Sequence, residues 1–278
     1  MTGAVVARLP DGRMHLQHGP IDIIAQAWGD AAAVAEGERL AATRFGSVLA
    51  ELAAELPVLR REAGQPTGSI GQKMAQATAA FAPRFITPMA AVAGAVADAV
   101  LSALAIPGVT RAYVNNGGDI ALHLIPGESL TCAIATQPGW PDRLTLRAED
   151  AVRGIATSGW RGRSWSLGIA DSVTVLGRTA AMADAAATMI ANAVDLPGHP
   201  GICRRPAVDL QADSDLGTRP VTVAVARLSA AEVAAALAAG SAAAESFRRR
   251  GLIEAAALFL QSETRVIGPV ALKEPALV

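Results

Sequence analysis

Alternation of hydrophobic and polar residues predicts short strands along much of the chain. A β-meander is expected over residues 4–27, because two alternating segments flank the turn signal Asp11-Gly12 and a third follows Gly19-Pro20. Another strand, turn and strand is expected over residues 109–124, with the turn at Asn115-Asn116-Gly117-Gly118-Asp119. The same pattern predicts further strands at residues 130–135, 144–146, 172–175 and 219–227.

Apolar residues at helical spacing predict helices between these strands. The expected helical segments are residues 31–59, 69–81, 89–104 and 229–260, with an alanine-rich helix after residue 175 and a loop at 197–206. Asp30 is expected to cap the first helix, and Pro57 to kink or end it. An extended entry is expected before Pro88, because the residue preceding a proline avoids the α region.

These elements predict an α+β fold in which helices pack against a largely antiparallel sheet. The 278 residues are enough for one large core, and no linker or repeat divides them, so a single domain over residues 1–278 is expected. The hydrophobic share is 51%, but much of it is alanine and only 4% of the chain is aromatic. The core is therefore expected to depend on close helix packing.

Charge and composition narrow the classes of partner. The formal net charge of −1 argues against general affinity for nucleic acid or an anionic membrane, since both usually require a basic excess. The apolar run at residues 86–106 contains Thr87, Pro88 and Asp98, which favours a buried helix over a membrane span. Two isolated cysteines and no visible signal peptide indicate a reducing compartment, so a cytoplasmic location is expected.

The predicted turn at residues 115–119 is the first candidate binding element. Its two glycines, Gly117 and Gly118, would let the backbone approach a ligand closely. Asn115, Asn116 and Asp119 could then bond to the polar edge of that ligand. The same residues also fit an ordinary hairpin turn, because Asn and Gly tolerate positive φ.

A glycine-punctuated loop at residues 157–163 is the second candidate element. Its expected ligand-binding residues are Thr157, Ser158, Gly159, Trp160, Arg161 and Arg163. Hydroxyl groups and guanidinium forks suit phosphate, and Trp160 or Trp165 could stack on an aromatic ring. A surface loop with solvated arginines is the alternative interpretation, although two exposed tryptophans would be unusual.

Asp184 and Thr188 form the candidate metal site. They are four residues apart on a predicted helix and therefore share one face. Their oxygens could bind Mg²⁺ or Ca²⁺, with water, phosphate and a backbone carbonyl completing the shell. A solvated aspartate and a threonine bonded to its own helix fit the same spacing. The four histidines lack zinc spacing, and the sequence has no GxSxG elbow, P-loop or dinucleotide fingerprint.

Taken in order, the motifs resemble the ApbE superfamily, whose best-known members are Mg²⁺-dependent flavin transferases that move FMN from FAD onto a protein threonine. The matching motifs are AVAGAVAD (91–98), NNGGDI (115–120), ATSG (156–159), SVTVL (172–176) and ADAAAT (183–188). Over nearly the whole chain the sequence is most similar to a branch called uncharacterised protein family 0280. The resemblance implies an ApbE-like fold, a metal ion held by Asp184 and Thr188, and FAD or another nucleotide-like ligand.

Two departures from the flavin transferases bear on activity. Those proteins carry a histidine and an Asp-Pro-Arg-Thr-Gly run between the TSG and SVTV motifs, where this chain has residues 160–171 without a histidine. They also carry a lysine before the glycine of the small-residue helix, where this chain has Ala93. Both departures argue against FMN transfer.

Three functions stay open from the sequence. The first is an Mg²⁺-dependent transferase for a phosphorylated, ring-bearing cofactor, in which the metal and the arginines bind phosphate. The second is a cofactor-binding or carrier protein, which the missing histidine favours. The third is an enzyme of a different reaction on a precursor such as a pterin, with Asp119 or Asp171 as the acid or base. A homodimer is expected, with no nucleic-acid or membrane partner.

Overall fold

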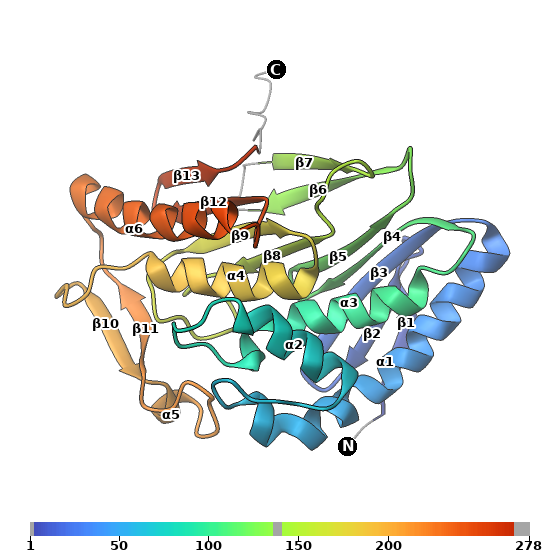
Figure 1. Cartoon of the computed structure of the whole chain (residues 1–278), viewed down its shortest axis with the longest axis horizontal. Helices are drawn as coiled ribbons and strands as arrows, with labels where there is room; N and C mark the ends of the chain where they lie inside the picture. The colour runs from blue at the N-terminus through green and yellow to red at the C-terminus, as the bar shows by residue number, and fades with distance from the viewer. Residues whose placement is uncertain (1–2, 136–140, 270–278) are drawn as a thin grey trace. The chain divides into compact units, whose positions relative to one another are not determined.

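The computed structural model describes residues 3–135 and 141–269 (Figure 1). The chain forms two compact units. Unit 1 comprises Met1–Cys132, Thr145–Ala156 and Gly177–Asp184. Unit 2 comprises Ala133–Leu144, Thr157–Leu176 and Ala185–Val278. The chain crosses between the units five times, and two of these crossings lie within strand β8 (Gly154–Ser158) and helix α4 (Ala180–Ala193). The expected single domain over residues 1–278 stays a prediction.

Unit 1 combines the predicted β-meander with three helices and a hairpin. Its elements are β1 (Val5–Arg8), β2 (Met14–His18), β3 (Ile21–Gly29), α1 (Ala31–Leu59), α2 (Ser69–Ala79), the 3₁₀ turn η1 (Pro88–Ala91), α3 (Val92–Leu104), β4 (Val109–Asn116) and β5 (Asp119–Leu124). The strands from β1 to β5 pair antiparallel in chain order, and the first residues of β8 pair with β5. Helix α3 packs on β4 and β5 and contacts α1 and α2 (Figure 1).

Local signals in the sequence fix several of these boundaries. Asp30 caps α1, because its carboxylate accepts the backbone N–H groups of Ala32 and Ala33 at 3.0 Å. Pro57 lies within the last turn of α1, which ends at Leu59 as expected. Most of the apolar run at residues 86–106 becomes α3, and no helix among the described residues is long and apolar enough to span a bilayer.

Unit 2 contains a second set of antiparallel strands. Its elements include β9 (Ser172–Gly177), β10 (Ile202–Pro206), α5 (Ala207–Leu210), β11 (Pro220–Val225), α6 (Ala230–Arg249), β12 (Ala255–Leu260) and β13 (Glu263–Ile267). Strand β12 lies between β9 and β13, and α6 packs on β12 and β13. Strands β10 and β11 form a separate two-stranded sheet. Ser229 and Glu232 form a capping box at the start of α6, where the helix expected over residues 229–260 begins.

The predicted α+β fold with a largely antiparallel sheet is confirmed. The strand pairs whose register the structure gives within each unit are antiparallel. Burial alternates along β2 and β4, which is the pattern of strands with one face on the core. Hydrophobic alternation therefore identified the correct fold class.

Four local predictions were wrong. Helix α6 ends at Arg249, and residues 255–260 form β12, which is buried at every position. Residues 255–260 are all apolar, so the sequence shows no alternation of apolar and polar residues that would distinguish a buried strand from a helix. Residues 202–206 form β10 instead of a loop, and Thr157 and Ser158 end strand β8. The strands β6 (Ser129–Ala135) and β7 (Pro141–Arg147) form their own two-stranded sheet, whereas they were expected to continue the main one.

A backbone contact between α3 and the first turn of α4 holds unit 1 together near the candidate site. Gly94 lies against Ala180, and a Cβ atom at Gly94 would stand 2.2 Å from the Ala180 carbonyl oxygen. Asp98, one turn further along α3, accepts the backbone N–H groups of Ala180 and Ala181 at 3.1 and 3.0 Å. Asp98 therefore caps α4 from another helix.

Substituting Gly94 by alanine is expected to destabilise the protein by about 2 to 3 kcal/mol, the upper range for overpacking, because the obstructing atoms are backbone atoms. Gly46 is the matched control, since it lies in α1 and a Cβ atom there would meet nothing within 4 Å. Gly46→Ala is expected to stabilise by about 1 kcal/mol through helix propensity. Urea unfolding followed by circular dichroism measures both. Equal stability of Gly94→Ala and the wild type would contradict the contact.

Candidate functional site

The predicted turn at residues 115–119 is a two-residue hairpin between β4 and β5. Asn116 and Asp119 are paired across it, and Gly117 and Gly118 have φ values of +65° and +116°. The side chain of Asn115 accepts the backbone N–H of Gly118 at 2.9 Å. The hairpin interpretation is therefore confirmed, and Asn115 has a structural role in the turn.

Asn116 and Asp119 point away from solvent and toward α3 and α4. Asn116 is 7% exposed, and its amide donates to the backbone carbonyl of Ala93 at 3.0 Å. Asp119 is 8% exposed, and its side chain is hydrogen-bonded to the carboxyl group of Asp184. The hairpin thus brings a second carboxyl group to Asp184, which the spacing of residues in the sequence did not predict.

Asp184 lies on α4 at the contact with α3. Its Oδ2 atom accepts the backbone N–H of Gly94 at 3.0 Å. Burial, together with the neighbouring charge of Asp119, raises the pKa of Asp184 well above the ordinary range of an aspartate. Hydrogen bonds from the backbone of Gly94 and Ala93 oppose this change without cancelling it. Two buried carboxyl groups in contact are stable only if a proton or a cation lies between them.

The residues at this position fit a hard divalent cation. Two carboxyl groups, with hydroxyl, carbonyl, water or phosphate oxygens, make the all-oxygen ligand set that Mg²⁺ prefers. The described part of the chain contains no cluster of three or more His, Cys, Asp and Glu side chains, so a metal ion here would have two carboxyl groups from such side chains. Asp184 is the last residue of unit 1, and Thr188 lies one turn further along α4, in unit 2. Their role as metal ligands stays a prediction.

Unit 2 contains the second candidate element, which begins with the last two residues of β8. Trp160 donates its indole N–H to Asp171 at 3.1 Å, and Arg161 donates its Nε–H to the same carboxylate oxygen at 2.6 Å. The Arg161 guanidinium also stacks on the Trp160 ring at 4.8 Å from its centre. Both side chains are therefore organised by Asp171, although the Arg161 side chain remains 63% exposed.

Asp171 anchors this loop. Its other carboxylate oxygen accepts the backbone N–H of Gln261, at the turn between β12 and β13. A Cβ atom at Gly159 would lie 2.4 Å from the Asp171 carbonyl oxygen, so the loop backbone also passes close by. This geometry suits a residue that positions Trp160 and Arg161. A role for Asp171 as an acid or base stays a prediction.

The remaining loop residues have different environments. The hydroxyls of Thr157 and Thr174 are hydrogen-bonded at 2.9 Å, Ser158 is half-buried, and Arg163 is exposed. Trp165 is 39% exposed, as a surface aromatic available for stacking would be.

Asp98 was not among the predicted site residues, because its partners are 82 and 83 residues away in sequence and nothing local identifies them.

Replacing Asp184 by asparagine is expected to stabilise metal-free protein at neutral pH. The pKa of Asp184 is higher in the folded state than in the unfolded state. The contribution of its proton to stability is therefore complete below the unfolded-state pKa and is lost as the pH rises through the folded-state pKa. Asparagine keeps an acceptor for the Gly94 N–H and carries no charge. Melting temperatures in EDTA between about pH 4 and about pH 8 should show wild type losing stability relative to Asp184→Asn as pH rises.

Asp209 provides the control for this measurement, because it is an exposed aspartate in α5. The Asp209→Asn melting curve should follow that of wild type across the pH range. A constant difference between wild type and Asp184→Asn at every pH would contradict the raised pKa.

Curated relatives share about a third of their residues with this chain over part of its length. A UPF0280 protein of Methanococcoides burtonii is 36% identical over 126 residues, which are 42% of this chain and 49% of the relative. A UPF0280 protein of Methanothrix thermoacetophila is 38% identical over 128 residues, or 45% of this chain and 52% of the relative. The matched part of the chain thus spans about half the length of these relatives.

Solved structures of flavin transferases align with most of the chain, at low similarity. The apo flavinyl transferase ApbE of Pseudomonas stutzeri has 13% sequence identity and a TM-score of 0.40, covering 96% of this chain and 95% of that one. The flavin transferase ApbE of Vibrio cholerae has 13% identity and a TM-score of 0.35, covering 95% and 96%. These values are too low to support an argument about function.

A family model decides the assignment. The model described as AbpE bacteria matches residues 6–266, which include both candidate elements and all of α4. The resemblance to ApbE-like proteins and to the UPF0280 branch is therefore confirmed, and the chain belongs to the AbpE bacteria family.

Proposed function

We propose that this protein binds a phosphorylated, ring-bearing ligand of the flavin or nucleotide type together with Mg²⁺. The observation that carries the proposal is the pair of carboxyl groups at Asp119 and Asp184, buried where α3 meets α4. Such a pair is costly to retain for stability alone, because desolvation and mutual repulsion both oppose its ionisation. A divalent cation would remove that cost and make the pair a ligand site.

The residues have separate proposed roles. Asp184 and Thr188 would supply carboxylate and hydroxyl oxygens to Mg²⁺, with Asp119 beside Asp184 as the second carboxylate. Bound Mg²⁺ would neutralise the charge of a phosphate group. The exposed guanidinium groups of Arg161 and Arg163 would attract phosphate, and Trp160 would present an aromatic face.

A flavin is the first ligand to test, because the family resemblance in sequence is to flavin transferases. A ligand that binds only the native state adds to the free energy of unfolding, by about 2.7 kcal/mol at a ligand concentration of 100 Kd. The melting temperature rises accordingly. FAD is expected to raise the melting temperature of wild type only when Mg²⁺ is present. Asp184→Asn should lose the Mg²⁺-dependent increase, and the exposed-site control Asp209→Asn should keep it.

Two outcomes of the melting experiment would contradict the metal site. One is an increase with FAD that is the same in EDTA and in Mg²⁺. The other is an Mg²⁺-dependent increase that survives unchanged in Asp184→Asn. ATP and a pterin, tested in parallel, identify the ligand class if FAD has no effect.

A carrier without transfer chemistry is the second candidate function, and a specific feature of the sequence favours it. Residues 160–171 contain no histidine, and in the structure Asp171 is occupied by bonds to Trp160, Arg161 and Gln261. No free acid or base is therefore evident among the described residues of this loop.

Product analysis separates the two functions. Transfer of FMN from FAD to an acceptor hydroxyl breaks the pyrophosphate bond and releases AMP, whereas a carrier returns FAD intact. Incubation of the protein with FAD, Mg²⁺ and threonine-containing acceptor peptides, followed by chromatography, is expected to recover FAD without AMP. Release of AMP that Asp184→Asn abolishes would overturn the carrier assignment and establish a transferase.

A further inference from the structure

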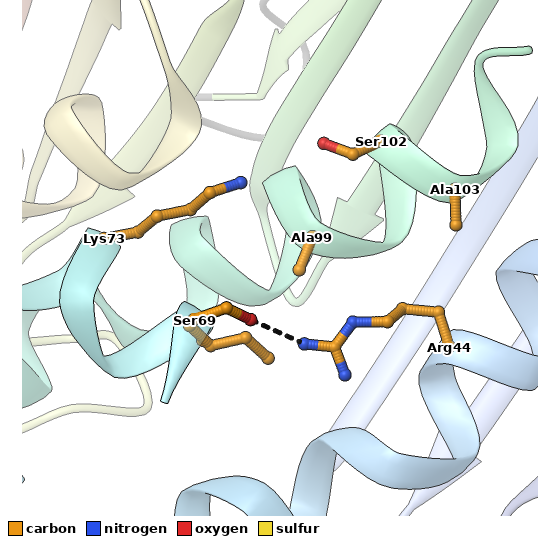
Figure 2. Close-up of a pocket in the computed structure, with 7 residues that line it drawn as sticks. Arg44, Ser69, Lys73, Ala99, Ser102 and Ala103 are labelled. Atoms are coloured by element: carbon orange, nitrogen blue, oxygen red, sulfur yellow. Dashed lines mark hydrogen bonds between the residues drawn. The ribbon is translucent and has the colours of Figure 1, made fainter. Parts of the chain in front are cut away.

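Helices α1, α2 and α3 of unit 1 form a cleft of about 320 Å³, and it contains none of the residues proposed for the metal site (Figure 2). Its apolar part consists of Ile70 of α2 and of Ala99 and Ala103 of α3. The short alanine side chains leave this space where larger ones would fill it. The volume is at the lower end of the range for small-molecule sites, about 300 to 1,000 Å³.

The charged residues that line the cleft are both positive. Arg44 enters from α1 and Lys73 from α2, as Figure 2 shows. Arg44 forms an ion pair with Glu51 at 2.7 Å and also donates to Ser47 at 2.8 Å. The Lys73 ammonium has no hydrogen bond or ion pair within the part of the chain that the structure describes. Asp98 of α3 is near enough for the Lys73 charge to favour its ionised form, but its two oxygens already accept the backbone of α4.

Two backbone N–H groups at the start of α2 are not available to a ligand. The N–H of Ile70 donates to Glu51 at 3.1 Å, and that of Gly68 donates to Glu55 at 2.9 Å. The two glutamates of α1 therefore already accept these two N–H groups. The cation that lines the cleft and has no ion-pair partner in the described residues is Lys73.

The hydroxyl of Ser102 restricts the chemistry further. It donates to the backbone carbonyl of Asp98 at 2.7 Å, so its proton is already used and its oxygen can only accept. In Figure 2 the Lys73 side chain extends along α3 toward Ser102. Lys73 and Ser102 are both exposed to solvent, and a ligand that carries an anion and a hydroxyl group would bond to both in place of water.

The choice of lysine at this position also stands out. Among the 24 lysine and arginine residues of the chain only Lys73 and Lys273 are lysines. An ammonium group is a compact charge with three donors, and lysine is a common point-charge ligand for phosphate. This chain therefore uses a rare residue at the cleft.

We propose that the cleft between α1, α2 and α3 is a second binding site, for a small phosphate monoester that also carries a hydroxyl group. Lys73 binds the phosphate, while Arg44, already paired with Glu51, lines the α1 side of the cleft. The Ser102 oxygen accepts from the ligand hydroxyl, and Ala99 and Ala103 contact its carbon atoms. This site is separate from the proposed Mg²⁺ site and needs no metal.

The small number of lysines allows a direct test. Reductive methylation with ¹³C-formaldehyde keeps the lysine charge and labels Lys73, Lys273 and the amino terminus. The Lys73 signal is assigned by its loss in Lys73→Arg. Titration with glycerol 3-phosphate in EDTA is expected to shift the Lys73 signal to saturation and to leave the Lys273 signal in place. Equal shifts of both signals, or no shift of Lys73, would overturn the proposal.

Calorimetry on unlabelled variants tests the two parts of the cleft. Lys73→Gln should weaken glycerol 3-phosphate binding at least about tenfold, equivalent to about 1.4 kcal/mol. Ala103→Leu should weaken it similarly by filling the cleft without changing its charge. Arg61→Gln, which removes an exposed charge elsewhere in unit 1, should have no effect.

The controls separate this proposal from simpler explanations. If Arg61→Gln weakens binding as much as Lys73→Gln, the attraction is general and the site is refuted. If Ala103→Leu binds like wild type, the ligand does not occupy the cleft. Asp184→Asn should bind glycerol 3-phosphate normally, so failure of the Mg²⁺ site would leave this result unchanged.

Discussion

The close backbone contact between α3 and the start of α4 is the constraint on which the organisation of unit 1 depends. Gly94 lacks a side chain where any Cβ atom would collide with Ala180, so the two helices approach to backbone distance. At that distance Asp98 can cap α4 and Asp184 can accept the Gly94 N–H. The alanine-rich sequences of α3 and α4 suit this contact, because larger side chains would separate the helices.

The same contact explains why two carboxyl groups are buried together. The hairpin that carries Asp119 is held to α3 by the bond from Asn116 to the Ala93 carbonyl. This arrangement brings Asp119 against Asp184 and raises the pKa of Asp184. In unit 2, by contrast, the carboxylate of Asp171 is neutralised locally by Arg161 and supports a loop. Asp171 thus organises the loop around it. The pair of Asp119 and Asp184 instead carries an electrostatic cost that binding of a cation would relieve.

Features of the fold with a local cause could be predicted from the sequence. The cap at Asp30, the Gly117-Gly118 turn and the alternating strands all depend on residues a few positions apart. Strand β12 was missed because its uniformly apolar sequence has no diagnostic period. The role of Asp98 and the pairing of Asp119 with Asp184 depend on residues that are distant in sequence, as does the cleft at Lys73. Motif order indicated the family, but it could not show these contacts.

The divalent cation site proposed at Asp119 and Asp184 can be tested directly in crystals. Mn²⁺ replaces Mg²⁺ at oxygen-ligand sites and can be located by its anomalous X-ray scattering. A crystal of the protein soaked in Mn²⁺ should show an anomalous peak within bonding distance of the Asp184 carboxylate. Absence of a peak there, with the two carboxyl groups still in contact, would mean that they share a proton and would contradict the account.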